Sequence, residues 1–211
     1  MERDHIEKEK ILRGFFGDNE STPLVLDIDD FFLLKKNGIL DAKVMLQLQS
    51  EVEALIGNGC FALLDREEVS AFAMEKDGIP IIALYAGTLK RILYAANLLM
   101  LSDAFLPEIG DMAACYHDIS SVAYTPKTDE DNGSVLKMTI SGDPCREKVG
   151  YMIACLAIYF VVYHEVGHHE KGHVRKLKEK YNLYYSEAPY TWISDEYLEE
   201  RKRMELEADM Y

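Results

Sequence analysis

Residues 143–173 read DPCREKVGYMIACLAIYFVVYHEVGHHEKGH, and they predict the longest helix of the chain. Asp143 is suited to cap the N-terminus of this helix. Pro144 follows at the first helical position, where its missing N–H would have no partner anyway. Most of the residues between there and His164 are apolar. We therefore expect one helix over about 144–170, which is the strongest secondary-structure prediction in the chain.

The end of this helix carries the pattern H-E-x-x-H, formed by His164, Glu165 and His168. Residues i and i+4 lie on one helical face, so both imidazoles can bind one tetrahedral zinc ion. Glu165 is offset to the side, where it can reach a metal-bound water and act as a general base. Leu156 and Phe160 precede His164 on the same side, so we expect this face to point into the core. A chance match, with both histidines satisfied by ordinary hydrogen bonds, is the alternative.

Two further histidines, His169 and His173, do not complete a metal site by their spacing. The metzincin pattern places a third histidine ten residues after the first, whereas His173 follows His164 by nine. On a continued helix His173 would point about 180° away from His164, and His169 would lie about 140° off. We interpret both as helix-end or turn residues, and a role in contacting a ligand residue stays open.

A second helix, predicted over about 195–211, offers carboxylates to the same metal. Glu205 and Asp209 are spaced i and i+4, so one helical face presents both side chains. One can bind the metal, and the other can orient a ligand histidine by accepting its second ring N–H. Glu207 lies about 160° from Asp209 around the helix and is the weaker ligand candidate. A solvated acidic helix is the alternative, because the ERKR stretch just upstream is typical of a surface.

HExxH followed by E-x-x-A-D at residues 205–209 resembles the gluzincin zinc metallopeptidases. Their CAAX-protease and heat-shock membrane peptidase branches carry the third-ligand glutamate in an ExxAD motif. The resemblance implies that His164, His168 and Glu205 bind Zn²⁺ and that Glu165 is the general base. It also implies that Asp209 is a carboxylate behind a ligand histidine. The expected fold is α+β, a zincin-like metallopeptidase domain with a small antiparallel sheet and a metal-binding active-site helix.

The stretch IIALYAGTLKRILYAANLLMLSDAFLPEIGD and the form HEVGHHEKGH are similar to the soluble phage-exclusion (Lit-type) peptidases of bacteria. This similarity covers about 30 residues upstream of HExxH and the two metal motifs. It implies a zinc-dependent endopeptidase that cleaves a host protein during phage exclusion. Enzymes of this class usually bind the substrate as an extra strand on a sheet edge. Residues 135–140 are our candidate for that edge, and an interior strand is the equal alternative. Candidate oxyanion donors, by position only, are Tyr181, Tyr184, Tyr185, Tyr190 and Tyr197.

The rest of the sequence predicts smaller elements of a single domain over residues 1–211, beginning with a charged segment at 1–20. Residues 42–57 have helical spacing and end at a Gly-Asn-Gly stop. Apolar runs on either side of Asp77-Gly78 predict a hairpin within a small antiparallel meander. A helix should follow, with Thr88 as its candidate N-cap and Pro107 beyond its end. A second hairpin is expected across the acidic loop at 127–134.

Composition narrows the classes of function further. The formal net charge of −14 argues against nucleic acid as a partner, because phosphate binding needs a basic surface. The four cysteines show no metal-ligand spacing, which favours reduced core cysteines in a cytoplasmic protein. The N-terminus has no apolar signal region. The longest uncharged stretch, residues 149–163, is shorter than the roughly 20 residues that span a bilayer, so we expect no membrane partner.

Two other functions compete with that of a peptidase. A zinc-binding regulatory or protein-interaction module with little or no turnover would carry the same ligands. A structural interaction protein would carry the histidines incidentally, without a metal. The substrate protein and the oligomeric state are left open by the sequence.

Overall fold

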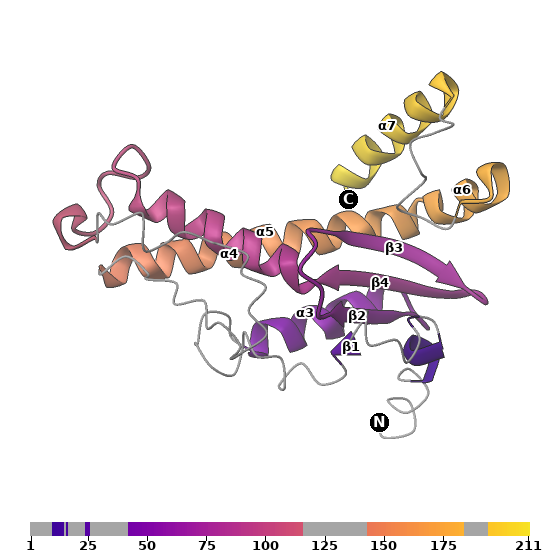
Figure 1. Ribbon diagram of the computed structural model, residues 1–211, viewed down its shortest axis with the longest axis horizontal. Coiled ribbons are helices and arrows are strands. Elements are labelled where there is room, and N and C mark those ends of the chain that lie inside the picture. The colour runs from indigo at the N-terminus through magenta and orange to yellow at the C-terminus, as the bar shows by residue number, and fades with distance from the viewer. Residues whose placement is uncertain (1–9, 15, 17–23, 26–41, 116–142, 184–193) are drawn as a thin grey trace.

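The computed structural model describes residues 10–14, 16, 24–25, 42–115, 143–183 and 194–211, and it shows a mixed α+β protein (Figure 1). The labelled elements are β1 (Leu24–Val25), α3 (Ala42–Leu55), β2 (Cys60–Leu64), β3 (Ala71–Lys76), β4 (Ile79–Tyr85), α4 (Ala86–Leu101), the 3-10 helix η2 (Met112–Ala114), α5 (Pro144–Glu170), α6 (His173–Tyr181) and α7 (Asp195–Asp209). Residues 10–14 and 16 are also helical. The second predicted hairpin, including residues 135–140, lies outside the described residues.

The sheet has four described strands in the order β1-β2-β4-β3. The predicted hairpin is confirmed: β3 and β4 are antiparallel, and they are joined by Asp77 and Gly78, which both have positive φ. The prediction of a wholly antiparallel sheet was wrong, because β2 pairs with β4 in parallel. Both of these central strands are apolar along nearly their whole length and buried on both faces, as parallel strands are. The strand β3 is left at the edge of the sheet.

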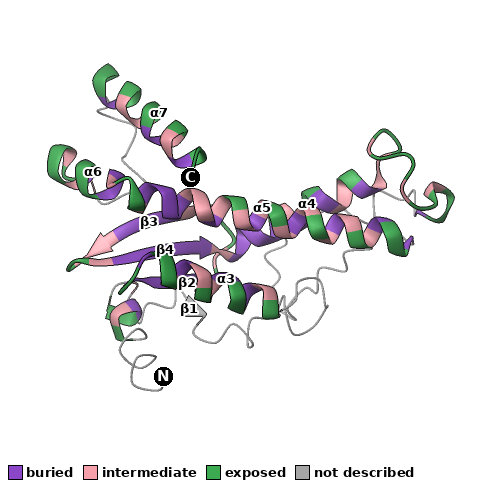
Figure 2. Cartoon of the chain, turned by 180° about the vertical axis from the view of Figure 1, so that it is seen from behind, coloured by how far each residue is buried: buried purple, intermediate pink, exposed green. Residues whose placement is uncertain are grey.

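Successive residues of a strand point to opposite faces of the sheet, so alternate residues pack into two separate hydrophobic cores, one on each face. On one face, Phe61, Ala73 and Ile82 pack with residues of α3, α4 and α5. On the other face, Phe72 and Ile81 pack with the N-terminal helical residues. Figure 2 shows buried residues along the strands and along the sides of the helices that meet them. The helix α5, which carries the HExxH motif, is therefore anchored on one face of the sheet.

The helix α4 follows β4 without a loop, and this corrects its predicted start. Its N-cap is Tyr85, so the prediction of Thr88 as N-cap was wrong. Thr88 is buried within the helix, and its Oγ1 accepts a hydrogen bond from the Ser70 N–H at 2.8 Å. The same hydroxyl donates to the Ser70 carbonyl at 2.7 Å. The threonine thus ties the start of α4 to the strand connection before β3.

The helix α5 has the predicted bounds and the predicted cap. Asp143 accepts a hydrogen bond from the Arg146 N–H at 2.8 Å, and Pro144 begins the helix. Arg146 itself has no exposed surface. Its guanidinium donates five hydrogen bonds, at 2.6–3.0 Å, to the carbonyls of Met100, Ser102, Phe105, Leu106 and Ile109. One side chain therefore holds the end of α4, and the loop after it, to the start of α5.

The apolar side of α5 differs from the prediction in one respect. Ala154, Ile158, Val162 and Val166 form the buried side, whereas Leu156 and Phe160 are 69% and 59% exposed. The expectation that these two residues face the core was wrong, because the sheet lies against the neighbouring side of the helix. By its length and apolar composition alone, α5 could also cross a membrane. The core helix of a soluble protein can meet the same two criteria. In this fold α5 contacts β3, β4, α3 and α4.

Candidate metal centre

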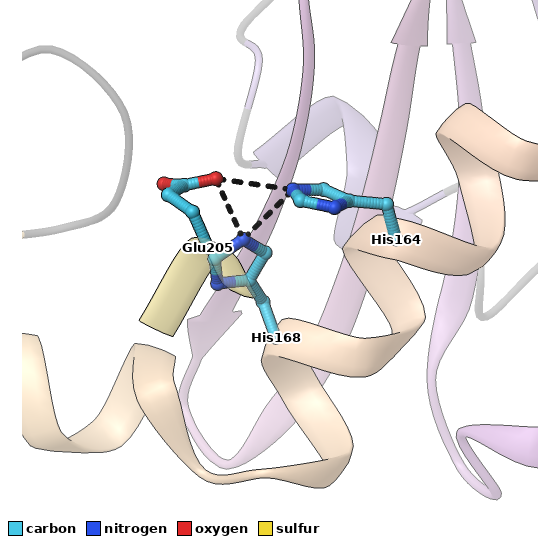
Figure 3. A group of neighbouring side chains, drawn as sticks. All are labelled: His164, His168 and Glu205. Carbon is cyan, nitrogen blue, oxygen red and sulfur yellow. Dashed lines mark hydrogen bonds and ion pairs between the residues drawn. The ribbon is translucent and has the colours of Figure 1, made fainter. Parts of the chain in front are cut away.

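Two helices far apart in the chain bring three ligand groups together. The last turns of α5 carry His164 and His168, and the C-terminal part of α7, which carries Glu205, lies beside that end of α5 (Figure 1). The two imidazole Nε2 atoms are 3.0 Å apart. Glu205 Oε2 lies 3.1 Å from His164 Nε2 and 3.4 Å from His168 Nε2. Figure 3 shows these three atoms as a closed triangle, with all three side chains pointing toward one another.

The size of this triangle fits a tetrahedral zinc site. Zinc–nitrogen and zinc–oxygen bonds of about 2.0–2.2 Å at tetrahedral angles require ligand atoms about 3.3–3.5 Å apart. The three observed separations of 3.0, 3.1 and 3.4 Å reach or approach this range. Two imidazoles and one carboxylate are also a donor set that zinc prefers. Within the described residues, this is the group of histidine, cysteine and acidic side chains close enough to hold one ion.

The approach of α7 to α5 depends on small residues. Tyr197, Met204 and Ala208 form the buried side of α7. Ala208 packs directly on Gly167 of α5, where an added Cβ would lie 2.9 Å from the Ala208 carbonyl oxygen. Ser194 caps the start of α7 by accepting from the Tyr197 N–H at 3.2 Å, which confirms the predicted start. The close contact at Gly167 places the last turn of α7 beside His164.

Asp209 lies behind one of the two histidines. Its Oδ1 is 2.8 Å from His164 Nδ1, the ring nitrogen that does not face Glu205. A carboxylate there accepts the Nδ1–H and leaves the Nε2 lone pair directed at the site. This is the place that the gluzincin resemblance implies for Asp209. Glu205, by contrast, faces both Nε2 atoms, and its hydrogen bond to His168 helps to lower the pKa of its carboxyl to about 2.

Glu165 is buried at the side of this triangle. It is 5% exposed, and its carboxylate accepts a hydrogen bond from the backbone N–H of Ala73 on β3. Within the described residues, Glu165 Oε2 is the one buried side-chain polar atom with no hydrogen-bond partner. Burial, and then the nearby negative charge of Glu205, raise the pKa of Glu165 to about 8. An unsatisfied buried carboxylate oxygen is costly, and such groups are concentrated at functional sites.

His173 lies beside the ligands, contrary to the geometry of a continued helix. The helix α5 ends at Glu170, and Gly172 takes a left-handed conformation with φ of 70° before α6 begins at His173. This turn brings His173 Nδ1 to 3.2 Å from His168 Nδ1. His173 Nε2 is 3.0 Å from Glu207 Oε2. The Lys-Gly pair before His173 is a helix-stop signal from which the change of direction could have been inferred.

His173 and Glu207 therefore have partners that their spacing on a continued helix did not predict. Burial lowers the pKa of His173. The hydrogen bond from His173 is the main cause of the lowered pKa of Glu207. Glu207 is no part of the ligand triangle, as its place on the helix predicted. His169 is partly exposed near the end of α5.

A separate polar cluster holds α6 to α7. Glu200 on α7 lies 2.6 Å from Lys176 Nζ and 2.7 Å from Lys180 Nζ. It also accepts a hydrogen bond from the Tyr181 hydroxyl at 2.6 Å. The hydrogen bond from Lys176, followed by those from Lys180 and Tyr181, lowers the pKa of Glu200 to about 2. This cluster fixes the half of α7 that precedes Glu205.

The tyrosines proposed as oxyanion donors take other places where they are described. The hydroxyl of Tyr181 is bound to Glu200, and its ring packs edge-on against Tyr197 at 4.9 Å between centroids. Both belong to the small core between α6 and α7. Tyr184, Tyr185 and Tyr190 lie outside the described residues. The four cysteines are all described, and none of them forms a disulfide there.

Comparisons of this chain with protein-family models, with curated proteins and with solved structures found no match. Its function has to be inferred from the site itself.

Proposed function

We propose that this protein is a zinc-dependent endopeptidase of zincin-like fold, with His164, His168 and Glu205 as metal ligands and Glu165 as general base. The observation that carries the proposal is the triangle of Nε2, Nε2 and Oε2 atoms with separations of 3.0–3.4 Å, beside a buried carboxylate. A chance HExxH motif has no reason to meet a carboxylate from a helix 41 residues away at this spacing. Three protein ligands also leave the fourth position of a tetrahedral zinc for water or substrate, which distinguishes catalytic sites from structural ones.

Zinc held by these residues would supply Lewis acidity, which polarises a carbonyl group and makes a water molecule more acidic. Glu165 then receives the proton of the attacking water on its unpaired Oε2 and passes it to the leaving amine. The hydrogen bond from Ala73 holds the carboxylate in place for this exchange. Without the metal the pKa of Glu165 is raised to about 8. A divalent cation beside it favours the charged form, which is the form that accepts a proton.

The edge strand β3 is the best place for a polypeptide substrate. The Tyr85 N–H donates to the Ser70 carbonyl, and this pairing turns the backbone groups of Ala71, Ala73 and Glu75 away from β4. The N–H of Ala73 donates to Glu165 and Ala73 is fully buried, so this edge borders the site, and the partly exposed Ala71 and Glu75 are the residues that can pair with an added strand. A substrate in extended form can add to β3 as a further strand, with its scissile bond near the ligands. The Lit-type resemblance favours a cytoplasmic host protein as that substrate.

Zinc stoichiometry and cleavage, measured on the same samples, test the proposal. We expect about one zinc per chain in the wild type and new protein N-termini in a bacterial lysate incubated with it. Glu165→Gln should bind zinc with similar affinity and lose cleavage by at least about 100-fold, in the range that a general base contributes. Glu170→Gln, at the exposed end of the same helix, is the matched control and should leave both unchanged.

Three results would contradict the proposal. Absence of zinc from the wild type would remove the metal centre altogether. Stoichiometric zinc with no new N-termini would favour the regulatory or interaction module. Equal cleavage by the wild type and Glu165→Gln would exclude Glu165 as the base.

A further inference from the structure

Two side chains, those of His173 and Glu207, form a hydrogen-bonded chain behind His168, on the side away from His164. His173 Nδ1 lies 3.2 Å from His168 Nδ1, and His173 Nε2 lies 3.0 Å from Glu207 Oε2. The two rings are nearly perpendicular, with centroids 5.2 Å apart. His168 is 1% exposed and His173 3%, so water cannot replace these contacts. The chain ends at the half-exposed carboxylate of Glu207.

The order of protons along this chain follows from metal binding. If His168 binds a metal through Nε2, its proton is on Nδ1, and that N–H needs an acceptor. The atom facing it is His173 Nδ1, which accepts only if it carries no proton. The proton of a neutral His173 is then on Nε2, where it is donated to Glu207. A doubly protonated His173 would direct an N–H against the His168 N–H, so this arrangement requires a neutral ring.

We propose that His173 and Glu207 are positioning residues of the metal centre, which hold His168 in the Nδ1–H tautomer with Nε2 turned toward Glu205 and the metal. This inference rests on the proposed metal site. It makes the two ligand histidines alike, because the second ring nitrogen of each is linked to a carboxylate of α7. His164 reaches Asp209 directly, whereas His168 reaches Glu207 through His173. The turn at Gly172 is what allows a residue outside α5 to fill this place.

Zinc affinity, measured by competition with a chromogenic chelator, tests this role. His173→Phe keeps a ring in the space but removes the acceptor, so we expect zinc affinity to fall by about 10–100-fold, as for other groups that orient metal ligands. His173→Asn should recover part of that loss, because its amide oxygen takes roughly the place of Nδ1 and can accept the His168 N–H. Glu207→Leu should lose affinity several-fold, and Glu207→Gln, which keeps an acceptor, much less.

Matched control variants distinguish a positioning role of His173 and Glu207 from a general effect of substitution on the structure. His169→Phe makes the same change on the neighbouring helix, and Glu199→Leu removes an exposed carboxylate of α7. Both should bind zinc like the wild type. The visible spectrum of the cobalt-substituted protein should change in His173→Phe and stay unchanged in His169→Phe. If His173→Phe does not fold, His173→Asn and Glu207→Leu still decide the question by their relative affinities.

Imidazole ¹⁵N NMR of the zinc-loaded wild type provides an independent measurement. We expect a neutral His173 ring with its proton on Nε2 and none on Nδ1. A proton on Nδ1, or equal zinc affinity of His173→Phe and the wild type, would overturn the inference while leaving the metal centre intact. A wild type that binds no zinc would overturn the proposed function as well, so the two failures are distinguishable.

Discussion

Gly167 of α5 lies directly against the backbone of Ala208 of α7, so that a Cβ at residue 167 would be 2.9 Å from the Ala208 carbonyl oxygen. A neighbouring atom, Tyr211 Cβ, would be 3.0 Å away. This contact is one residue from His168 on α5 and one from Asp209 on α7. A close contact of the two helices thus lies beside the site, and we expect it to set the distance between Glu205 and the histidines.

Gly167→Ala should therefore weaken zinc binding. Alanine favours the helix by up to about 1 kcal/mol, but its methyl group meets backbone atoms that can yield only if α7 moves away. We expect zinc affinity to fall by roughly 10-fold or more, because the support of a ligand is altered. The control is Gly150→Ala on the same helix, where the new methyl group would meet the movable side chain of Met100. Equal losses in both variants would show that the α5–α7 contact does not set the site.

Removing Glu205, the proposed third ligand, should reduce zinc affinity more than removing Asp209, the carboxylate behind His164. Glu205→Ala deletes an oxygen that lies 3.1 and 3.4 Å from the two Nε2 atoms. Asp209→Ala should cost about 10–100-fold in zinc affinity, as an orienting group does, and Glu205→Ala should exceed this loss. Competition with a chelator measures both, with Glu196→Ala at the exposed start of α7 as control. If Glu205→Ala binds zinc like the wild type, another residue is the third ligand.

Acid should selectively weaken the cluster that joins α6 to α7. The folded-state pKa of Glu200, about 2, is below its ordinary value of 4.5, so the folded protein binds fewer protons than the unfolded chain between these values. The stabilisation from Glu200 is therefore complete above pH 4.5 and is lost as the pH falls toward 2. In urea unfolding of the metal-free protein, Glu200→Gln should be less stable than the wild type at pH 7. The difference should shrink steadily below about pH 5.

Glu199→Gln provides the comparison for this measurement, because Glu199 is exposed on the same helix. The free energy of unfolding of Glu199→Gln should equal that of the wild type at every pH. A difference between Glu200→Gln and the wild type that stays constant from pH 7 to pH 3 would contradict the assignment of the low pKa to Glu200.

Arg146 should be among the most sensitive positions for stability. Arg146→Met removes five hydrogen bonds to carbonyls at the end of α4 and in the loop after it, and these carbonyls are buried or partly buried. We expect a loss of at least about 3 kcal/mol in the free energy of unfolding. Chemical denaturation measures this loss, and Arg175→Met, at an exposed position of α6, should change it by less than about 0.5 kcal/mol. A small effect of Arg146→Met would mean that solvent replaces the lost donors.

The local elements were largely predictable because their signals lie within a few residues. The bounds of α5 follow from Asp143 and Pro144 at its start, and the β3–β4 hairpin follows from Asp77-Gly78. The start of α4 was missed, because Thr88 looks like a cap but is bound to Ser70 instead. The parallel pairing of β2 with β4 was also missed. Two continuous apolar runs are compatible with either direction of pairing, and the choice depends on which helices cover the sheet.

The sequence by itself determined that His164 and His168 share a face of one helix with Glu165 beside them, since four residues make slightly more than one turn and no distant contact is needed. It also placed Glu205 and Asp209 together on a second helix for the same reason. Only the tertiary structure decided how the two helices cross, because that depends on the packing of Gly167 against Ala208. It also decided that His173 turns back onto His168 and reaches Glu207. That arrangement depends on a left-handed turn at Gly172 and on α7, which begins 22 residues after His173, and helical spacing within α5 contains no information on either.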